Sequence, residues 1–379
     1  MDYKLTEDQE LIRNMVREFA ETEVKPIAAE IDRDSRFPTE TVQRLKELNL
    51  LGVPFPEQYG GAGADGVSFS IVVEELARAC ASTGAIVSTH TALGAHPIFQ
   101  FGTEEQKNKY LIPLASGENL GAFCLTEPAA GTDASAQQTT AVLQGDAYVL
   151  NGTKIFITNG GRAQTYIVMA MTDKSQGNKG ISAFIVDKGF PGFQVGQLEK
   201  QMGINATDTT EIIFKECRVP KQNLLAGEGQ GFKIAMNALD FGRVGIGSQA
   251  LGIAQASLEA SVNYAKERHQ FGKPLSSFQG LQWMMADMAV RVQAARHLVR
   301  HAAWSKDQGL LYSKEAAMAK LYASETAMWT STKAVQIHGG HGYTKEYPVE
   351  RFMRDAKITE IYEGTNEVQR MVIANNILK

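Results

Sequence analysis

The sequence predicts an α+β fold in which a helical segment, a β segment and a second helical segment follow one another. Apolar residues recur at helical spacing in residues 1–120 and again in residues 231–379, whereas residues 121–230 contain short β-branched and aromatic runs between turn signals. These elements are segregated and do not alternate as they would in a doubly wound parallel sheet. We therefore expect three domains with these boundaries.

Residues 1–120 are expected to be all-helical. Thr6 with Gln9, and Thr103 with Gln106, have the spacing at which a hydroxyl caps a helix start and an amide reaches back to it. After the first of these starts, apolar side chains recur at helical spacing at Leu11, Ile12, Met15, Val16 and Phe19. Each predicted helix therefore has one apolar face to bury against another element.

Residues 121–230 are expected to form a β domain. Strand-like runs occupy residues 148–150, 165–171, 181–186 and 210–214, and Gly-Asp, Asn-Gly and Pro-Gly pairs supply turns between such runs. Many short strands with frequent turns are typical of a β architecture that needs no crossover helices.

Residues 231–379 are expected to form an antiparallel helical bundle. Residues 281–308 and 310–338 contain neither Gly nor Pro. Each would span roughly 40 Å as one helix, and helices of this length suit a bundle.

Composition excludes several classes of protein. The chain has 379 residues, 44% of them apolar, so it can bury a large core without disulfides. Its net charge of −4 does not favour nucleic acid as a partner. The spacing of Cys80, Cys124 and Cys217 indicates neither a metal-type Cys pair nor a disulfide framework. The charged start MDYKLTEDQE and the lack of any run near ~18 apolar residues predict neither a signal peptide nor a membrane span. We expect a cytoplasmic protein.

Two motif-like patterns are interpreted as structural. Residues 61–66 match G-x-G-x-x-G, but Pro54 and Pro56 precede them where a nicotinamide-binding fold needs a buried strand. A loop before a helix is the better interpretation. His297 and His301 have ligand spacing, but no Glu-x-x-His pair accompanies them, so a solvated or interfacial helix face is expected and no metal site.

Three stretches are unusual for pure scaffolding. Residues 126–133 place small, hydrogen-bonding residues in a turn that could approach a phosphate or a flat ring. Residues 336–343 end a long helix with more glycine than a C-cap requires. In residues 361–370, capping explains Thr365 but leaves Glu363 without a structural role. Taken singly, each stretch is better explained as a loop or a cap than as a functional site.

Together these stretches resemble the acyl-CoA dehydrogenase family, and the likeness runs from Leu5 to Leu378. The matching motifs, in order, are FCLTEPAAGTDAS, KIFITNGG, ERHQFGKPLSSFQ, QIHGGHGY and RDAKITEIYEGTNEVQR. The likeness is greatest to the bacterial short-chain, butyryl-CoA type. It implies a helical domain, a middle β-barrel domain and a C-terminal four-helix bundle.

The resemblance also implies a reaction. Glu363 matches the catalytic base that removes the α-proton of an acyl-CoA thioester while the β-hydrogen leaves as hydride to FAD. A weakly acidic proton requires a base of raised basicity in a dry pocket. Some members carry the base at the position matching Gly242, which cannot serve here. Butyryl-CoA would become crotonyl-CoA, and electrons would pass to electron-transferring flavoprotein.

The remaining site residues are likewise implied by the resemblance. Own-subunit FAD contacts match Phe123, Leu125, Thr126, Gly131, Thr132, Phe156, Ile157, Thr158, Thr365 and Glu367. Contacts to the FAD of a neighbouring subunit match Arg268, Gln270, Phe271, Gln279, Gln336, Gly339 and Gly340. Substrate-side positions match Thr132, Asp240, Arg243 and Gly364. This chain has Phe156 where many members have Trp, and Thr132 where many have Ser.

The implied assembly is a homotetramer arranged as a dimer of dimers. Three alternatives remain open at this point. The chain could be an acyl-CoA oxidase, a dehydrogenase for branched or medium-chain acyl groups, or a non-catalytic subunit that binds acyl-CoA or flavin. An intact Glu363 argues against the last of these.

Overall fold

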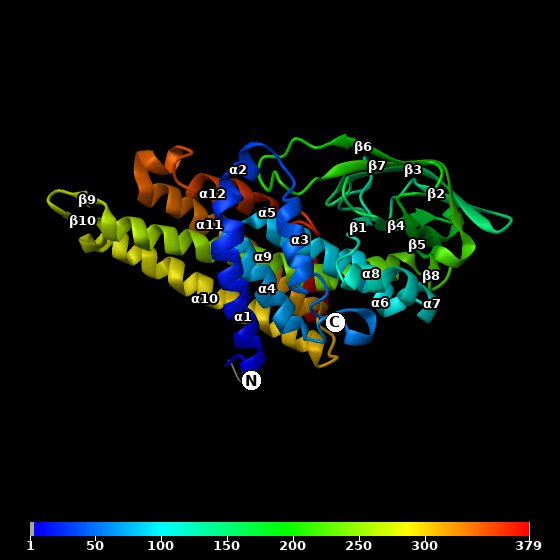
Figure 1. Cartoon of the computed structure of the whole chain (residues 1–379), viewed down its shortest axis with the longest axis horizontal. Coiled ribbons are helices and arrows are strands. Elements are labelled where there is room, and N and C mark those ends of the chain that lie inside the picture. Colours follow the sequence, from blue (N-terminus) through cyan, green and yellow to red (C-terminus); the bar gives the residue numbers. More distant parts are fainter. Residues whose placement is uncertain (1–3, 379) are drawn as a thin grey trace.

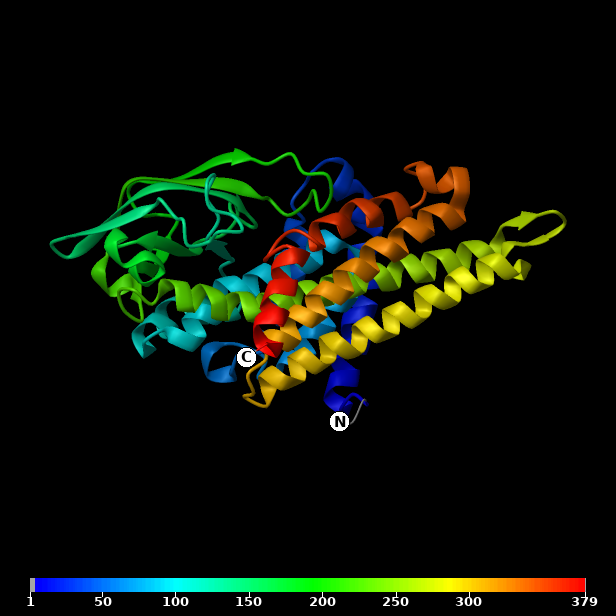
Figure 2. The ribbon, with the colours of Figure 1, turned by 180° about the vertical axis from the view of Figure 1, so that it is seen from behind.

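The computed structural model describes residues 4–378, in which helical, β and helical segments follow one another (Figure 1). The predicted α+β class is confirmed. Long helices of the C-terminal segment form an elongated body, with the sheet toward one end and a small hairpin at the other (Figures 1 and 2). The division into domains after residues 120 and 230 stays a prediction.

Both predicted capping boxes are present in the N-terminal segment: Thr6 and Gln9 cap α1, and Thr103 and Gln106 cap α7. The helices are α1 (Glu7–Phe19), α2 (Ala28–Arg33), α3 (Thr39–Glu47), α4 (Gly66–Ala79), α5 (Ala81–Ser88), α6 (His96–Phe101), α7 (Glu104–Gln106) and α8 (Ile112–Ala115). Short π segments interrupt this series at η1 (Ala20–Val24), η4 (Thr89–Ala95) and η5 (Lys107–Leu111), and 3-10 turns lie at η2 (Lys25–Ile27) and η3 (Glu57–Tyr59).

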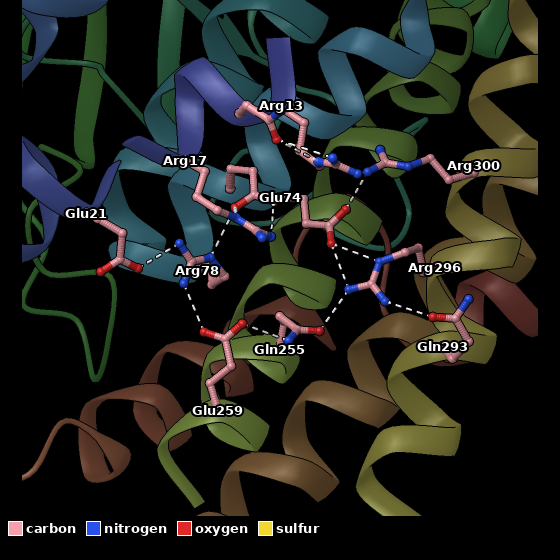
Figure 3. A network of polar contacts seen from close by, with 12 residues as sticks. Arg13, Arg17, Glu21, Glu74, Arg78, Gln255, Glu259, Gln293, Arg296 and Arg300 are labelled. Atoms are coloured by element: carbon pink, nitrogen blue, oxygen red, sulfur yellow. Dashed lines mark hydrogen bonds and ion pairs between the residues drawn. The ribbon is translucent and has the colours of Figure 1, made fainter. Parts of the chain in front are cut away.

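Helix α4 is buried at all 14 of its positions, although it carries three charged residues. Glu74 accepts hydrogen bonds from Arg296 and Arg300 of the C-terminal segment, at 2.9 and 2.5 Å. Glu75 pairs with Arg17 of α1 at 2.7 Å. Arg78 completes the network through Glu21 and Glu259 (Figure 3). Every buried charge of α4 therefore has a partner, and the network joins the first helical segment to the last.

The β segment forms one sheet in the order β6-β7-β3-β2-β4-β5-β8, with β1 paired to β4. Its strands are β1 (Gly121–Cys124), β2 (Thr140–Gln144), β3 (Ala147–Ile157), β4 (Thr165–Met171), β5 (Ile181–Asp187), β6 (Phe193–Leu198), β7 (Thr210–Pro220) and β8 (Leu224–Leu225), with 3-10 turns η6 (Lys174–Gly180) and η7 (Lys221–Asn223). All four predicted strand runs lie inside observed strands. Most pairs are antiparallel, and β1 runs parallel to β4.

The C-terminal segment contains the predicted long helices. They are α9 (Gly231–Glu267), α10 (Gln279–Asp307) and α11 (Ser313–His338), followed by the shorter α12 (Val349–Thr359) and α13 (Asn366–Ile377). The connections include the hairpin β9 (His269–Gln270) and β10 (Lys273–Pro274) and the 3-10 turns η8 (Leu275–Ser277) and η9 (Gly339–Tyr343). None of the helices within residues 4–378 is both long and apolar enough to pass through a membrane.

The two motif-like patterns have structural positions. Residues 61–65 lie in the loop before α4, and Gly66 is the first residue of that helix. The Asp65 side chain accepts from the Ser68 backbone N–H at 2.7 Å and so caps the helix. His297 and His301 lie on α10, where His301 stacks on Trp304. Arg296 and Arg300, beside these histidines, contact Glu74 of α4, whereas His297 itself is exposed.

Candidate active site

A cavity of about 600 Å³ lies where the sheet, α9 and the turn between α12 and α13 meet. Its walls come from elements that are far apart in the sequence. The lining residues are Thr89, Leu93, Phe123, Leu125, Thr126, Gly131, Thr132, Asp133, Ala134, Ser135, Phe156, Ile157, Thr158, Phe232, Met236, Leu239, Arg243, Ile358, Ile361, Tyr362, Glu363, Gly364, Thr365 and Val368. Apolar side chains dominate this lining, and a few charged or polar groups converge in it, as in typical small-molecule sites.

Glu363 lies in the turn between α12 and α13. Its φ of 52° is in the left-handed region, and Gly364 follows with φ 93°. A non-glycine residue with positive φ is held there by its surroundings, and such strain often marks a functional site. The Glu363 carboxylate points at α9: a Cβ placed on Gly242 would lie 2.0 Å from Glu363 Oε2. The absence of a side chain at Gly242 therefore makes room for this carboxylate.

The Glu363 carboxyl is poorly solvated. Oε2 is buried and has no hydrogen-bond partner within residues 4–378. Burial raises the pKa of Glu363 to about 8, and the charges of Arg243 and Lys320 oppose that rise. A carboxylate with a raised pKa and a partnerless oxygen, facing a cavity, has the properties of a general base.

Arg243 brings a positive charge to the same cavity. Its Nη1 donates to Asp240 Oδ1 at 2.6 Å, and the Ser313 hydroxyl donates to the other oxygen of Asp240. Burial raises the pKa of Asp240, while Arg243 acts in the opposite direction. Arg243 Nε is buried and makes no hydrogen bond in the described chain, so one donor of this guanidinium remains available.

A buried lysine organises the loop that forms the opposite wall. Lys154 Nζ donates to the Leu125 carbonyl at 3.0 Å, to Glu127 Oε1 at 2.8 Å and to Gln137 Oε1 at 2.9 Å. Glu127 in turn accepts from the backbone N–H of Gln138 and Thr139. The ends of the loop are thus tied to one charge, which holds Thr126–Thr132 against the cavity.

Phe156 projects from a bulge in β3. The register with β7 shifts between Lys154 and Ile157, and Phe156 has a φ of 58°. Its side chain is 60% exposed and lines the cavity. An aromatic ring so placed offers an apolar face to a planar ligand.

The structure brings most of the predicted site residues together and leaves others distant. Glu363, Arg243, Gly364 and Thr365 line the cavity, as do all predicted positions from Phe123 to Thr158. Asp240 reaches it through Arg243, and Glu367 is exposed in the first turn of α13. A further set is exposed toward the far end of the long helices, near the β9–β10 hairpin (Figures 1 and 2). This set comprises Arg268, Gln270, Phe271, Gln279, Gln336, Gly339 and Gly340.

The sequence did not predict several residues around Glu363 and around the loop between β1 and β2. Lys154 and Lys320 are fully buried, and Leu93 and Tyr362 line the cavity. The signal for Lys320 is its position among Ala316, Ala319 and Ala323, a helix face of small residues where a solvated lysine would not be expected.

The structure thus places a poorly solvated carboxylate at a cavity between a sheet and long helices. Family models for the acyl-CoA dehydrogenase N-terminal, middle and C-terminal domains match residues 6–118, 122–217 and 229–378. The chain belongs to the acyl-CoA dehydrogenase family and is an oxidoreductase.

Similar proteins cover the whole chain. A short-chain specific acyl-CoA dehydrogenase of Clostridium acetobutylicum is 59% identical over all of both chains. Butyryl-CoA dehydrogenase from Megasphaera elsdenii has a TM-score of 0.99 and 51% identity, again over all of both chains. Another similar chain comes from a structure of the electron transferring flavoprotein of Acidaminococcus fermentans, a study of flavin-based electron bifurcation. It has a TM-score of 0.99 and 56% identity over all of both chains. An acyl-CoA dehydrogenase complexed with FAD from Bacillus anthracis has a TM-score of 0.93 and 36% identity, and the match covers 99% of this chain and 67% of that one.

Proposed function

We propose that this enzyme oxidises short-chain acyl-CoA, with butyryl-CoA as substrate and crotonyl-CoA as product, and that Glu363 is the base. The observation that carries the proposal is the partnerless Glu363 oxygen in the cavity. The short-chain specific relative at 59% identity supports the substrate class.

FAD is the cofactor of this enzyme, and the residues present fit it. The loop at Thr126–Thr132 offers hydroxyl and backbone groups, Gly131 has open space where a Cβ would be, and Phe156 presents a ring. When bound, FAD supplies the acceptor for the β-hydrogen, which leaves the substrate as hydride. We propose that these residues, with Ile157, Thr158 and Thr365, hold it.

The chain's own residues would then carry the proton chemistry. Glu363 takes the α-proton on its free oxygen, and its raised pKa makes that transfer easier than for an ordinary carboxylate. Its backbone N–H donates to the thioester carbonyl and stabilises the charge that develops there. Leu93, Met236 and Leu239 exclude water from the acyl group. We propose that electrons pass on to electron transferring flavoprotein, the protein of the Acidaminococcus structure.

An anaerobic titration with butyryl-CoA, followed by flavin absorbance, tests this function. The wild type should bleach rapidly, and Glu363→Gln should retain FAD but bleach at least about 10²-fold more slowly. Glu360→Gln is the matched control, because Glu360 is in the same turn but pairs with Lys357 at 2.7 Å. Fast bleaching of the flavin in Glu363→Gln would refute the assignment of Glu363 as the base.

The alternative functions predict different results in such experiments. An oxidase would be reoxidised by air, and a medium-chain enzyme would show kcat/KM rising from butyryl- through octanoyl-CoA. The comparisons do not favour the oxidase, branched-chain or medium-chain alternatives. A non-catalytic subunit would not bleach at all.

We also propose a homotetramer in the cytoplasm, arranged as a dimer of dimers. The predicted FAD contacts near the hairpin, such as Arg268 and Phe271, are exposed at the far end of the long helices. They could act only in the cavity of another copy. A fully active, FAD-saturated monomer in sedimentation would contradict this assembly.

A further inference from the structure

Lys320 is a buried charge that the proposed reaction does not use. It lies on α11 with no exposed surface. Its Nζ donates to the Gly364 carbonyl at 2.8 Å and to Asn366 Oδ1 at 3.0 Å. Ser324 also donates to Asn366 Oδ1 at 3.0 Å. Within residues 4–378, no carboxylate forms an ion pair with this ammonium at 4 Å or less.

The groups that Lys320 holds belong to the turn that carries the candidate base. Gly364 directly follows Glu363, and both have positive φ. The Gly364 carbonyl also accepts from Gln369 Nε2 at 2.8 Å, and the Glu363 carbonyl accepts from the same nitrogen at 3.3 Å. Two donors thus fix the carbonyl of Gly364, the residue after Glu363, and one of them is the Lys320 ammonium.

Burial of an ammonium is costly unless nearby groups compensate. Desolvation lowers the pKa of Lys320, and the negative charge of Glu363 opposes this lowering most strongly. Glu360 and Glu367 act in the same direction as Glu363, whereas Arg243 adds to the lowering. The two charges therefore act on each other: Glu363 favours the charged form of Lys320, and Lys320 favours the charged form of Glu363.

We propose that Lys320 is a positioning residue for Glu363: its ammonium fixes the left-handed turn that aims the carboxylate at the cavity and favours the carboxylate's ionised form. This inference rests on the proposed function, because it assigns Lys320 to the base of that reaction. A purely structural lysine would stabilise the turn without affecting the ionisation of Glu363.

The test is the pH dependence of flavin reduction by saturating butyryl-CoA. Reduction requires ionised Glu363, so its rate rises as the pH passes the pKa of that group. In Lys320→Met this rise should move to higher pH by at least about half a unit, since a neighbouring positive charge is removed. The limiting rate should fall at least about tenfold, with KM for butyryl-CoA changing little.

Two further variants separate charge from anchoring. Lys320→Gln keeps a hydrogen-bond donor without the charge and should show the same pH shift, so it also serves if Lys320→Met does not fold. Asn366→Ala keeps the ammonium and removes one of its partners, so it should slow reduction without shifting the pH profile. Lys333→Met is the control, because Lys333 lies on the same helix beside Trp329.

Infrared difference spectra give a readout that does not depend on turnover. The protonated Glu363 carboxyl, assigned by its loss in Glu363→Gln, should persist to higher pH in Lys320→Met than in the wild type. An unshifted carboxyl and pH profile in both Lys320 variants would overturn the inference, and so would a wild-type rate in Asn366→Ala. If wild-type flavin were not reduced by butyryl-CoA, the proposed function itself would fail.

Discussion

At Glu363, ionisation opposes folding. Burial raises the pKa of this carboxyl from its ordinary 4.5 to about 8. A group with a raised folded pKa contributes stability below its unfolded pKa, and the contribution is lost as the pH rises through the folded value. Glu363→Gln stays neutral, so its advantage in thermal unfolding temperature over the wild type should grow between about pH 4.5 and about pH 8. An advantage that did not change with pH would contradict a protonated Glu363 whose Oε2 is buried.

A substitution at Gly242, which faces the Glu363 carboxylate, tests the position of this proposed base. In Gly242→Ala the new Cβ would lie 2.0 Å from Glu363 Oε2 and 3.0 Å from Leu93 Cδ2, so the carboxylate must move. A displacement of about 1 Å can cost 10²-fold in rate, and we expect at least a tenfold slower flavin reduction with FAD content unchanged. The control is Gly247→Ala, where the nearest atom is a Val299 methyl at 3.1 Å. Equal rates in the two variants would refute the contact.

Single residues were predictable where the sequence pattern left them without a structural role. Glu363 stood out in this way, because capping explained its neighbour Thr365. Lys154 and Lys320 did not stand out, since an isolated lysine is ordinarily exposed and their burial depends on partners more than 15 residues away.

Secondary structure was predictable where the hydrophobic period was long or the local chemistry strong. Residues 165–171 coincide with β4, and both capping boxes form. The π segment η4 was not predicted, because one extra residue per turn hardly changes apolar spacing over seven residues. The bulge that exposes Phe156 was not predicted either, since strand register is set by pairing with β7.

The loop between β1 and β2 should depend on Lys154. Lys154→Met leaves Glu127 buried without its counter-charge, and breaking such a pair costs about 3–5 kcal/mol. We expect a lower unfolding temperature and weaker FAD binding, measured by calorimetry and by cofactor retention on dilution. The double variant Lys154→Met/Glu127→Leu should recover stability while FAD binding stays weak, because the anchor of the loop is still missing. Recovery of both would limit Lys154 to a role in stability.

The charge network around α4 should contribute to the stability of the whole molecule, because it joins the first helical segment to the last (Figure 3). Glu74→Gln leaves Arg296 and Arg300 without their shared carboxylate, at a cost of about 3–5 kcal/mol. We expect a clearly lower thermal unfolding temperature, with the rate of flavin reduction in the folded enzyme unchanged. Glu23→Gln breaks the exposed pair with Arg44 and should cost only about 0–1 kcal/mol. Similar losses of thermal stability in the two variants would show that the buried network contributes no more to stability than an exposed ion pair.

The contact between Gly242 and Glu363 also limits how this enzyme can evolve. One small volume is shared by two positions that lie 121 residues apart, and it has room for one acidic side chain. If Glu363 is the base, as proposed, moving the base to position 242 requires two substitutions. If position 242 changes first, two side chains compete for the same space; if position 363 changes first, the lineage passes through an ancestor without a base. Both orders pass through a variant of low fitness, so the choice of base position should be inherited over long periods and should divide the family into lineages.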